Sequence, residues 1–250
     1  MIKKIKFELY RWKEWAASLF IYPRLNIHDK NYDEYWDYRH LTAQTPLNSF
    51  QEKRLELTLS YIQEGSSVTD IGAGNGLILL HLSNQKKLST ATVVDVSSRA
   101  LESAKGNGLQ VYKANISNVR ELDAISETDY ILFFEVLEHI PNSEEILLWA
   151  ISKAHKGVLF SVPNTGFFSH RLRLLFGKFP LQWRLNPSEH IRFWTLKDMK
   201  WWLRQLNIKE YNLHLYEGPI VLRSILPSLF SQGLFIYIPN LTTRIPKDNS

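Results

Sequence analysis

The residues best suited to acid–base or metal chemistry lie in two separate parts of the sequence. Two carboxylates and an imidazole occur together at Glu135, Glu138 and His139, and a second imidazole follows at His190. If a helix begins at the first run, the spacing of its three members puts them on one helical side. Such a set can bind a divalent cation that acidifies a hydroxyl, or one histidine can act as a general base. A structural role in capping the helix and packing the sheet edge is the third interpretation.

A glycine-rich turn lies upstream of these residues, in the run Asp70-Ile71-Gly72-Ala73-Gly74-Asn75-Gly76. It follows an expected strand and precedes an expected helix, and glycine lets a ligand approach the backbone closely. The next expected strand ends at Asp95, whose carboxylate can accept hydrogen bonds from both hydroxyls of a ribose. The turn therefore predicts a binding site for a nucleoside-like cofactor.

The details of this turn discriminate between cofactors. A dinucleotide fingerprint requires a third glycine where this sequence has Leu77. A P-loop requires a Gly-Lys-Ser/Thr run, which does not follow the turn. Asp70 repels a pyrophosphate but suits a cationic ligand. S-adenosylmethionine has an ammonium, a sulfonium and one ribose but no phosphate, and it is the cofactor that the turn favours.

The elements that must position these residues alternate along the chain. We expect strands at 68–71, 91–95, 109–113, 130–134 and 157–162. We expect helices at 48–63, 77–82, 99–105, from 142 onward and at 195–206, with Ser97 as an N-cap. Apolar strands separated by helices are typical of a parallel sheet covered on both faces, which binds ligands at the carboxyl ends of its strands. The last 40 residues should supply one or two closing strands.

Residues from about 35 to 208 resemble class I S-adenosylmethionine-dependent methyltransferases. The glycine turn, the acid that ends the second strand and the run from Glu135 to Ile140 carry this resemblance. The runs 160–167, 171–175 and 179–180 resemble MetW-like proteins, whereas the Glu-x-x-Glu-His run with a later His is similar to ubiquinone-pathway and Hen-type O-methyltransferases. The resemblance implies an α/β, Rossmann-like, doubly wound and mostly parallel seven-stranded sheet, with N-terminal helices and a basic insertion after strand five.

The same resemblance implies a role for each candidate site residue. Asp70, Gly72 and Gly74 would contact the methionine end of the cofactor, and Arg54 would contact its carboxylate. Asp95 would bind the ribose, and Val96 and Asn115 would contact the adenine. Phe134 would lie along the cofactor. In the ubiquinone-type and Hen-type enzymes, the groups that match Glu135, Glu138, His139 and His190 bind Mg²⁺ and the oxygens of the substrate.

The function implied is methyl transfer from S-adenosylmethionine to a hydroxyl of a small molecule, a sugar or a lipid-linked glycan. It would proceed either with Mg²⁺ or another divalent cation, or without a metal and with His139 or His190 as the base. The alternative is a MetW-like protein that binds the cofactor and regulates a partner acyltransferase. An RNA 2′-O-methyltransferase is a lesser alternative, and a nucleic acid acceptor is not favoured because no RNA-binding module is visible.

Charge is distributed unevenly along the 250 residues, whose net charge is +5. Residues 1–24 predict a basic amphipathic helix, either a lid within an N-terminal cover of 1–47 or a peripheral contact with an anionic membrane. The methyltransferase domain would cover 48–250. Its insertion at 164–188 has basic and aromatic residues but no acid, and it would either recognise an anionic acceptor or pack as a cap.

The sequence also excludes several kinds of protein. It has no cysteine, so disulfide scaffolds, thiolate zinc sites and cysteine nucleophiles are ruled out. Neither a secretory signal nor a membrane-spanning run is apparent. The expected location is the cytoplasm, with a peripheral contact at the inner membrane face as a further hypothesis.

Overall fold

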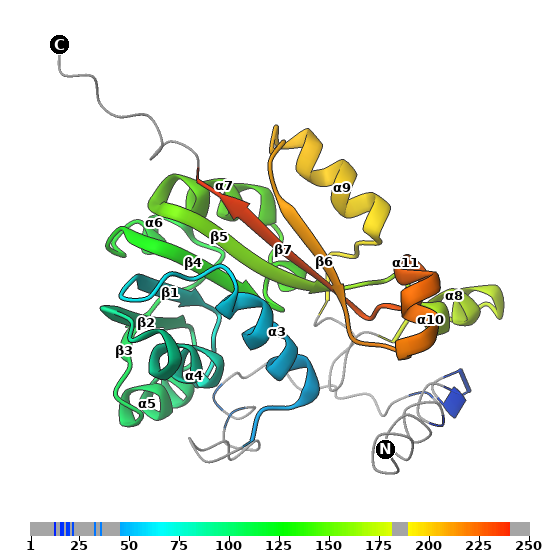
Figure 1. Ribbon diagram of the computed structural model, residues 1–250, viewed down its shortest axis with the longest axis horizontal. Helices are drawn as coiled ribbons and strands as arrows, with labels where there is room; N and C mark the ends of the chain where they lie inside the picture. The colour runs from blue at the N-terminus through cyan, green and yellow to red at the C-terminus, as the bar shows by residue number, and fades with distance from the viewer. Residues whose placement is uncertain are drawn as a thin grey trace.

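A seven-stranded sheet lies at the centre of the part of the chain that the structure describes (Figure 1). This computed structural model describes residues 46–181 and 190–240, together with residues 13, 16, 17, 19, 20, 22, 33 and 36. The strands are β1 Ser67–Ile71, β2 Thr90–Asp95, β3 Gln110–Lys113, β4 Thr128–Phe134, β5 Ala154–Pro163, β6 Asn212–Tyr216 and β7 Gly233–Pro239. Their order is β3-β2-β1-β4-β5-β7-β6, and β7 is antiparallel to both of its neighbours. The expected doubly wound, mostly parallel sheet is confirmed.

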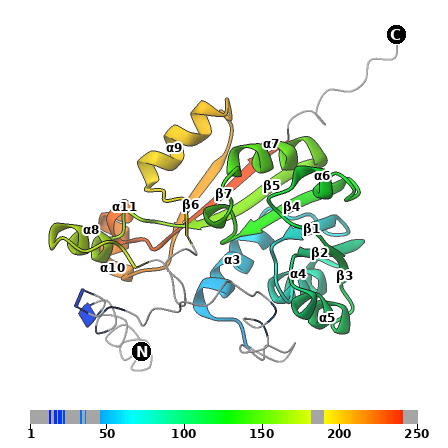
Figure 2. The ribbon, with the colours of Figure 1, turned by 180° about the vertical axis from the view of Figure 1, so that it is seen from behind.

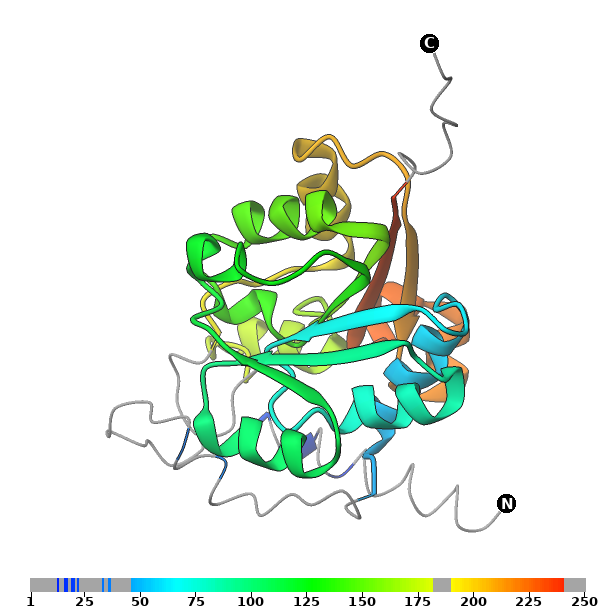
Figure 3. The ribbon, with the colours of Figure 1, turned by 90° about the vertical axis from the view of Figure 1, so that its left-hand side faces the viewer.

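Helices cover both faces of this sheet, as the views from opposite sides and from the edge show (Figures 1–3). The helices are α3 Ser49–Leu59, α4 Leu77–Lys86, α5 Ser98–Gly106, α6 Val119–Leu122, α7 Ser143–Lys153, α8 Phe168–Leu175, α9 Leu196–Gln205, α10 Ile220–Ile225 and α11 Pro227–Phe230, with a 3₁₀ turn η1 at Leu137–His139. Helices α3, α4 and α5 contribute to one apolar core, and α6, α7 and α9 to the other. Along β4, Ile131 and Phe133 face the second core while Tyr130 and Leu132 face the first, as the alternation of a strand requires.

Local signals in the sequence fix several helix ends. The Ser97 hydroxyl accepts a hydrogen bond from the backbone of Ala100 at 3.2 Å, so the predicted N-cap of α5 is confirmed. Helix α9 begins with a reciprocal capping box between Thr195 and Asp198. Helix α4 continues to Lys86, beyond its expected end at residue 82, and stops where Lys87 turns into the left-handed region with φ of 46°.

The strand order places a topological switch point between β1 and β4, because the chain adds β2 and β3 on one side of β1 and β4 on the other. In such sheets ligands bind beyond the carboxyl ends of the strands at this point. The glycine turn follows β1, Asp95 is the last residue of β2, and Glu135 directly follows β4. The fold therefore brings all three to one edge of the sheet.

The N-terminal cover expected at 1–47, with its amphipathic helix at 1–24, lies mostly outside the described residues. Within the expected insertion at 164–188, residues 168–175 form α8, while 182–188 also lie outside them. Asn164 connects this region to the sheet. Its side-chain amide donates hydrogen bonds to the carbonyls of Ser228 and Ser231, at 3.1 and 2.7 Å, and its oxygen accepts one from the backbone of Gly166 at 2.9 Å.

Because Asn164 is fully buried, we expect Asn164→Ala to lower the free energy of unfolding by roughly 2–4 kcal/mol, as three backbone groups lose their partner. Urea denaturation of the whole chain measures this change. Asn84→Ala, at an exposed position of α4, is the matched control and should change stability by less than about 0.5 kcal/mol. Equal stability of the two variants would show that Asn164 does not anchor this region.

Candidate functional site

The turn after β1 depends on glycines that adopt left-handed backbone angles. Gly72 and Gly74 have φ of 70° and 58°, which L-residues with side chains rarely adopt. A Cβ on Gly72 would lie 2.7 Å from a methyl group of Val136, and one on Gly74 would collide with the ring of Trp36. The glycines therefore allow close packing from two directions, from the segment after β4 and from the N-terminal region.

Asp95 is the residue that holds this turn in place. Its buried carboxylate accepts hydrogen bonds from the backbone N–H of Gly74 at 2.8 Å and of Ser97 at 2.9 Å. Burial raises the pKa of Asp95, and the N–H groups of Ser97 and Gly74 oppose that shift. Since a carboxylate offers about four lone-pair sites, it retains acceptor capacity for the two hydroxyls of a ribose.

Asp70 lies near the carboxyl end of β1, at the same edge of the sheet, and is buried. It pairs in register with Val93 of β2 and Leu132 of β4. Its Oδ1 atom has no hydrogen-bond partner among the described residues. Burial raises the pKa of Asp70 well above its ordinary value, and the nearby Asp95 carboxylate raises it further. A cationic ligand beside Asp70 would offset both effects, so an ammonium or sulfonium fits this position.

Two residues that sequence reasoning missed lie at this edge of the sheet, where Asp33 contacts the start of α5 and Trp36 contacts the glycine turn. The carboxylate of Asp33 accepts hydrogen bonds from the Ser97 hydroxyl at 2.6 Å and from the backbone of Arg99 at 3.2 Å. The ring of Trp36 packs against Gly74. No motif marks either residue in the sequence, because their contacts arise only from the folded chain.

The remaining predicted cofactor contacts lie at or near the same edge. Val96 is 38% exposed beside Asp95, and Phe134 ends β4 with its ring stacked on Phe235 at 5.9 Å. Asn115 is exposed, but its side-chain oxygen accepts a hydrogen bond from the backbone of Ser117 at 3.0 Å. The contacts of Val96, Phe134 and Asn115 with a cofactor stay predictions.

Arg54 takes part in a polar network that joins α3 to the ends of β4 and β6. Its Nη2 atom lies 3.5 Å from Glu135 Oε1, and its Nε donates a hydrogen bond to the hydroxyl of Tyr216 at 2.9 Å. The hydroxyls of Ser161 and Tyr216 donate to Glu135 at 2.9 and 3.3 Å. Burial by itself would lower the pKa of Arg54, but Tyr216 and Glu135 raise it above its ordinary value. The guanidinium thus stays charged, and its predicted contact with a cofactor carboxylate stays a prediction.

The backbone at Glu135 is unusual, because this residue has a φ of 58° without being glycine. Residues held in that region cost free energy and cluster at functional sites. Tyr216 reaches Glu135 only because Gly233 lies directly opposite it on β7, where a Cβ would collide with the tyrosine ring. Neither Tyr216 nor Gly233 was recognised in the sequence, since the signal is a strand register.

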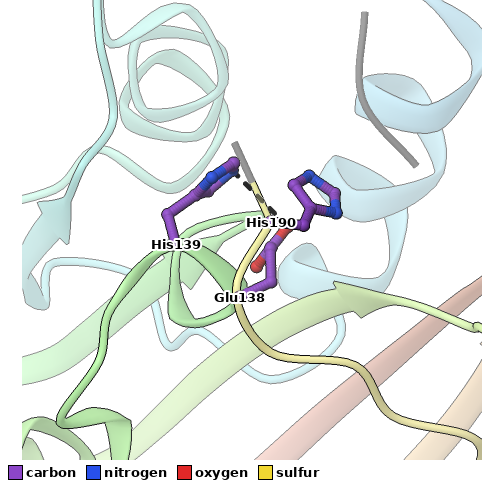
Figure 4. A group of neighbouring side chains, drawn as sticks. All are labelled: Glu138, His139 and His190. Carbon is purple, nitrogen blue, oxygen red and sulfur yellow. Dashed lines mark ion pairs between the residues drawn. The ribbon is translucent and has the colours of Figure 1, made fainter. Parts of the chain in front are cut away.

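Three of the four candidate metal ligands come together in the structure. A carboxylate oxygen of Glu138 and one ring nitrogen each of His139 and His190 lie within 4.8 Å of one another (Figure 4). His139 Nε2 is 3.9 Å from Glu138 Oε1, and the two imidazole rings are 4.6 Å apart in an edge-to-face arrangement. Glu135 is not in this group, because the segment forms the 3₁₀ turn η1 rather than a helix that starts at Glu135.

The backbone of the η1 turn explains how His190 reaches its partners. The carbonyl of Glu138 accepts hydrogen bonds from the N–H groups of Ile191 and Arg192 at 2.9 and 3.1 Å. Arg192 in turn forms an ion pair with Glu144 in α7, at 2.6 Å. These contacts fix the residues that follow His190 against η1.

The Glu138 carboxylate is the group in this cluster that most needs a partner. Glu138 is buried, and neither of its carboxylate oxygens has a hydrogen-bond partner within the described part of the chain. Burial raises the pKa of Glu138 well above its ordinary value, and Glu135 raises it further. A cation bound beside it would offset this cost, so the donor set fits a divalent ion.

The strand order and the glycine turn at the switch point define a class I methyltransferase fold. The model of the methyltransferase domain family matches residues 35–211 of the chain, and the chain belongs to that family. It is a class I S-adenosylmethionine-dependent methyltransferase that is similar to MetW proteins, in agreement with the resemblance seen in the sequence.

Curated relatives agree with this class. The ubiquinone biosynthesis O-methyltransferase of Candida albicans is 28% identical over 163 residues, which cover 57% of this chain and 50% of that protein. The bifunctional methionine biosynthesis protein MetXA/MetW of Rhodopirellula baltica is 25% identical over 177 residues, or 65% of this chain and 27% of that protein. The chain thus spans half or less of the length of these two relatives.

Solved structures share the fold at low sequence identity. A methyltransferase from Archaeoglobus fulgidus superimposes with a TM-score of 0.58 at 16% identity, covering 84% of this chain and all of that one. The methyltransferase domain of the bacterial CtHen1-CN protein superimposes with a TM-score of 0.54 at 19% identity. The match covers 76% of this chain and 97% of that one. These similarities establish the architecture.

We expect Asp95→Ala to weaken binding of S-adenosylhomocysteine by roughly ten- to a hundred-fold, because the turn loses its anchor and the predicted hydrogen bonds from the ribose hydroxyls lose their charged acceptor. Isothermal titration calorimetry measures the affinity. Asp198→Ala, in the capping box of α9, is a control that removes a carboxylate away from the site. Unchanged affinity in Asp95→Ala would contradict the assigned role.

Tyr216→Phe should lower the free energy of unfolding by roughly 1.5–3 kcal/mol, because Arg54 and Glu135 are left with one fewer partner in a buried network. We expect Gly233→Ala to destabilise at least as much, since the added methyl group displaces the Tyr216 ring. Denaturant unfolding measures both. Tyr237→Phe, whose hydroxyl donates a 3.4 Å hydrogen bond to the carbonyl of Lys156, is the control. Equal losses of unfolding free energy in Tyr216→Phe and Tyr237→Phe would show that the network of Arg54, Glu135 and Tyr216 does not stabilise the fold.

Proposed function

We propose that the protein transfers the methyl group of S-adenosylmethionine to a hydroxyl oxygen of an acceptor. The observation that carries this proposal is the meeting of two features at one sheet edge, the turn held by Asp95 and the group of Glu138, His139 and His190. Val136, two residues before Glu138, packs against Gly72 of the turn. A methyl donor at the turn would therefore lie next to the groups that handle an acceptor proton.

The residues of the turn suit this donor for physical reasons. Bound S-adenosylmethionine supplies a methyl group activated by its positive sulfonium. Asp95 would accept the ribose hydroxyls, and Asp70 would face the cationic methionine end. Holding donor and acceptor in line supplies much of the rate in such a displacement. The chain's own task is thus to position both molecules and to exclude water.

Removal of the acceptor proton falls to the histidine cluster. His139 or His190 would accept the proton of the hydroxyl directly. A divalent cation held by Glu138, His139 and His190 would instead lower the pKa of that hydroxyl. Two imidazoles and one carboxylate favour a transition-metal ion such as Mn²⁺ over Mg²⁺, which prefers oxygen ligands.

The acceptor that we propose is a small molecule, a sugar or a lipid-linked glycan. The names of the ubiquinone-pathway relatives support an oxygen acceptor. The basic residues expected to contact an anionic acceptor lie in two settings, since Arg171 is exposed whereas Arg173 is buried and donates to the carbonyl of Phe179 at 2.8 Å. A regulatory role like that of a MetW protein would appear as cofactor binding without release of S-adenosylhomocysteine.

We expect excess chelator to lower methyltransferase activity at least ten-fold and added Mn²⁺ to restore it more fully than Mg²⁺, because of the two imidazole ligands. Release of S-adenosylhomocysteine with a panel of hydroxyl acceptors measures turnover. Full activity in excess chelator would rule out the metal-assisted form.

A pair of histidine variants tests whether His190 takes part in the reaction or has only a structural role. His190→Ala should lower kcat by about a hundred-fold under either mechanism. His155→Ala, an exposed histidine of β5, is the matched control and should retain normal turnover. Normal kcat in His190→Ala would exclude His190 from the reaction and leave it a structural role.

A further inference from the structure

Exposed apolar side chains gather at one end of the molecule. Of fifteen large apolar residues that are exposed in the described part of the chain, ten belong to this end. They are Phe20, Tyr22, Leu174, Leu175, Phe176, Phe179, Ile220, Val221, Ile225 and Leu226. Helices α8, α10 and α11 lie side by side there, far from β3 and α5 (Figures 1 and 2). We call these ten residues the apolar end face.

Contacts between distant segments make this face a single surface. The rings of Phe168 in α8 and Phe230 in α11 are 5.4 Å apart. Lys178 donates a hydrogen bond to the carbonyl of Leu19 at 3.2 Å and lies 5.2 Å from the ring centre of Tyr22. The end of α8, the α10–α11 pair and the segment around Tyr22 are therefore held together.

The charges in the two described segments that supply most of the apolar end face have one sign, apart from Glu217 directly before the second segment. Neither 164–181 nor 218–240 contains an aspartate or glutamate. Both segments carry basic side chains, among them the exposed Arg171, the half-buried Lys178, and Arg223 in α10. Two copies docked through this face would bring like charges together, and a purely apolar partner would leave the cations unpaired. A surface that is anionic and has apolar groups beneath its charges would contact the exposed apolar side chains of this face and pair with its basic ones.

We propose that the apolar end face docks on an anionic lipid bilayer. Short helices with exposed apolar side chains and neighbouring cations suit the boundary between headgroups and acyl chains. Val221 and Leu175 are 70% and 77% exposed, and they would enter this boundary while Arg171 and Arg223 pair with lipid phosphates. No helix in the described part of the chain is long and apolar enough to cross a membrane, so docking would be peripheral.

This surface differs from the amphipathic helix expected at 1–24, because eight of its ten members lie at 174–179 and 220–226, in or next to α8 and α10. It also stands independently of the proposed reaction, since none of its residues belongs to the glycine turn or to the histidine cluster. Docking through this face would bring the enzyme to acceptors that reside in a membrane.

Sedimentation of the full chain with vesicles tests the proposal. We expect the protein to pellet with phosphatidylcholine vesicles that contain an equal share of phosphatidylglycerol, and several-fold less with phosphatidylcholine alone. Higher salt should weaken binding, because it screens Arg171 and Arg223. Val221→Asp and Leu175→Asp, one on each helix, should each lower the pelleted fraction several-fold.

Trp201→Asp, at a 55% exposed position of α9, adds the same charge elsewhere and should pellet like the wild type. Binding of S-adenosylhomocysteine by every variant reports correct folding and tests the cofactor site separately. The proposal is overturned if the wild type does not pellet with anionic vesicles, or if both face variants pellet normally. It is also overturned if the face variants abolish a dimer that does not bind vesicles.

Discussion

The buried carboxylate of Asp95 is the contact on which the site depends. It ends β2, and its two oxygens accept the N–H groups of Gly74 and Ser97. These bonds fix the glycine turn relative to the start of α5, so that one side chain sets the position of two segments. Burying a carboxylate costs free energy, and buried carboxylates with a raised pKa cluster at functional sites. The buried position of Asp95 therefore favours a role in binding.

The rest of the site follows from how the strands end. β1 and β4 are neighbours in the sheet, so the turn after one and the η1 turn after the other lie together. The carbonyl of Glu138 then binds the backbone after His190, a residue distant in sequence. Parallel strands thus bring the glycine turn, Asp95 and the η1 turn to one edge, and hydrogen bonds from the loop before α9 place His190 beside them.

Much of this arrangement could be predicted from the sequence. Apolar runs separated by helices indicated the parallel sheet, and a serine two residues after Asp95 indicated the start of α5. The antiparallel β7 was not specified, because the direction of a closing strand depends on its connection. Tyr216 reads as an ordinary core aromatic until the strand register places it opposite Gly233. The sequence also did not indicate that Glu135 would lie outside the group of Glu138, His139 and His190, because that depends on the left-handed backbone at Glu135 and on the η1 turn that follows it.

We infer that the switch point of this sheet binds an adenosyl group through its ribose, and that the buried Asp70 carboxylate disfavours a pyrophosphate there. Calorimetric titration of the unmodified protein, with S-adenosylhomocysteine and with NAD⁺ in parallel, tests it most directly. We expect saturable heat for S-adenosylhomocysteine at a single site and none for the dinucleotide. Saturable binding of NAD⁺ together with no heat from S-adenosylhomocysteine would contradict it.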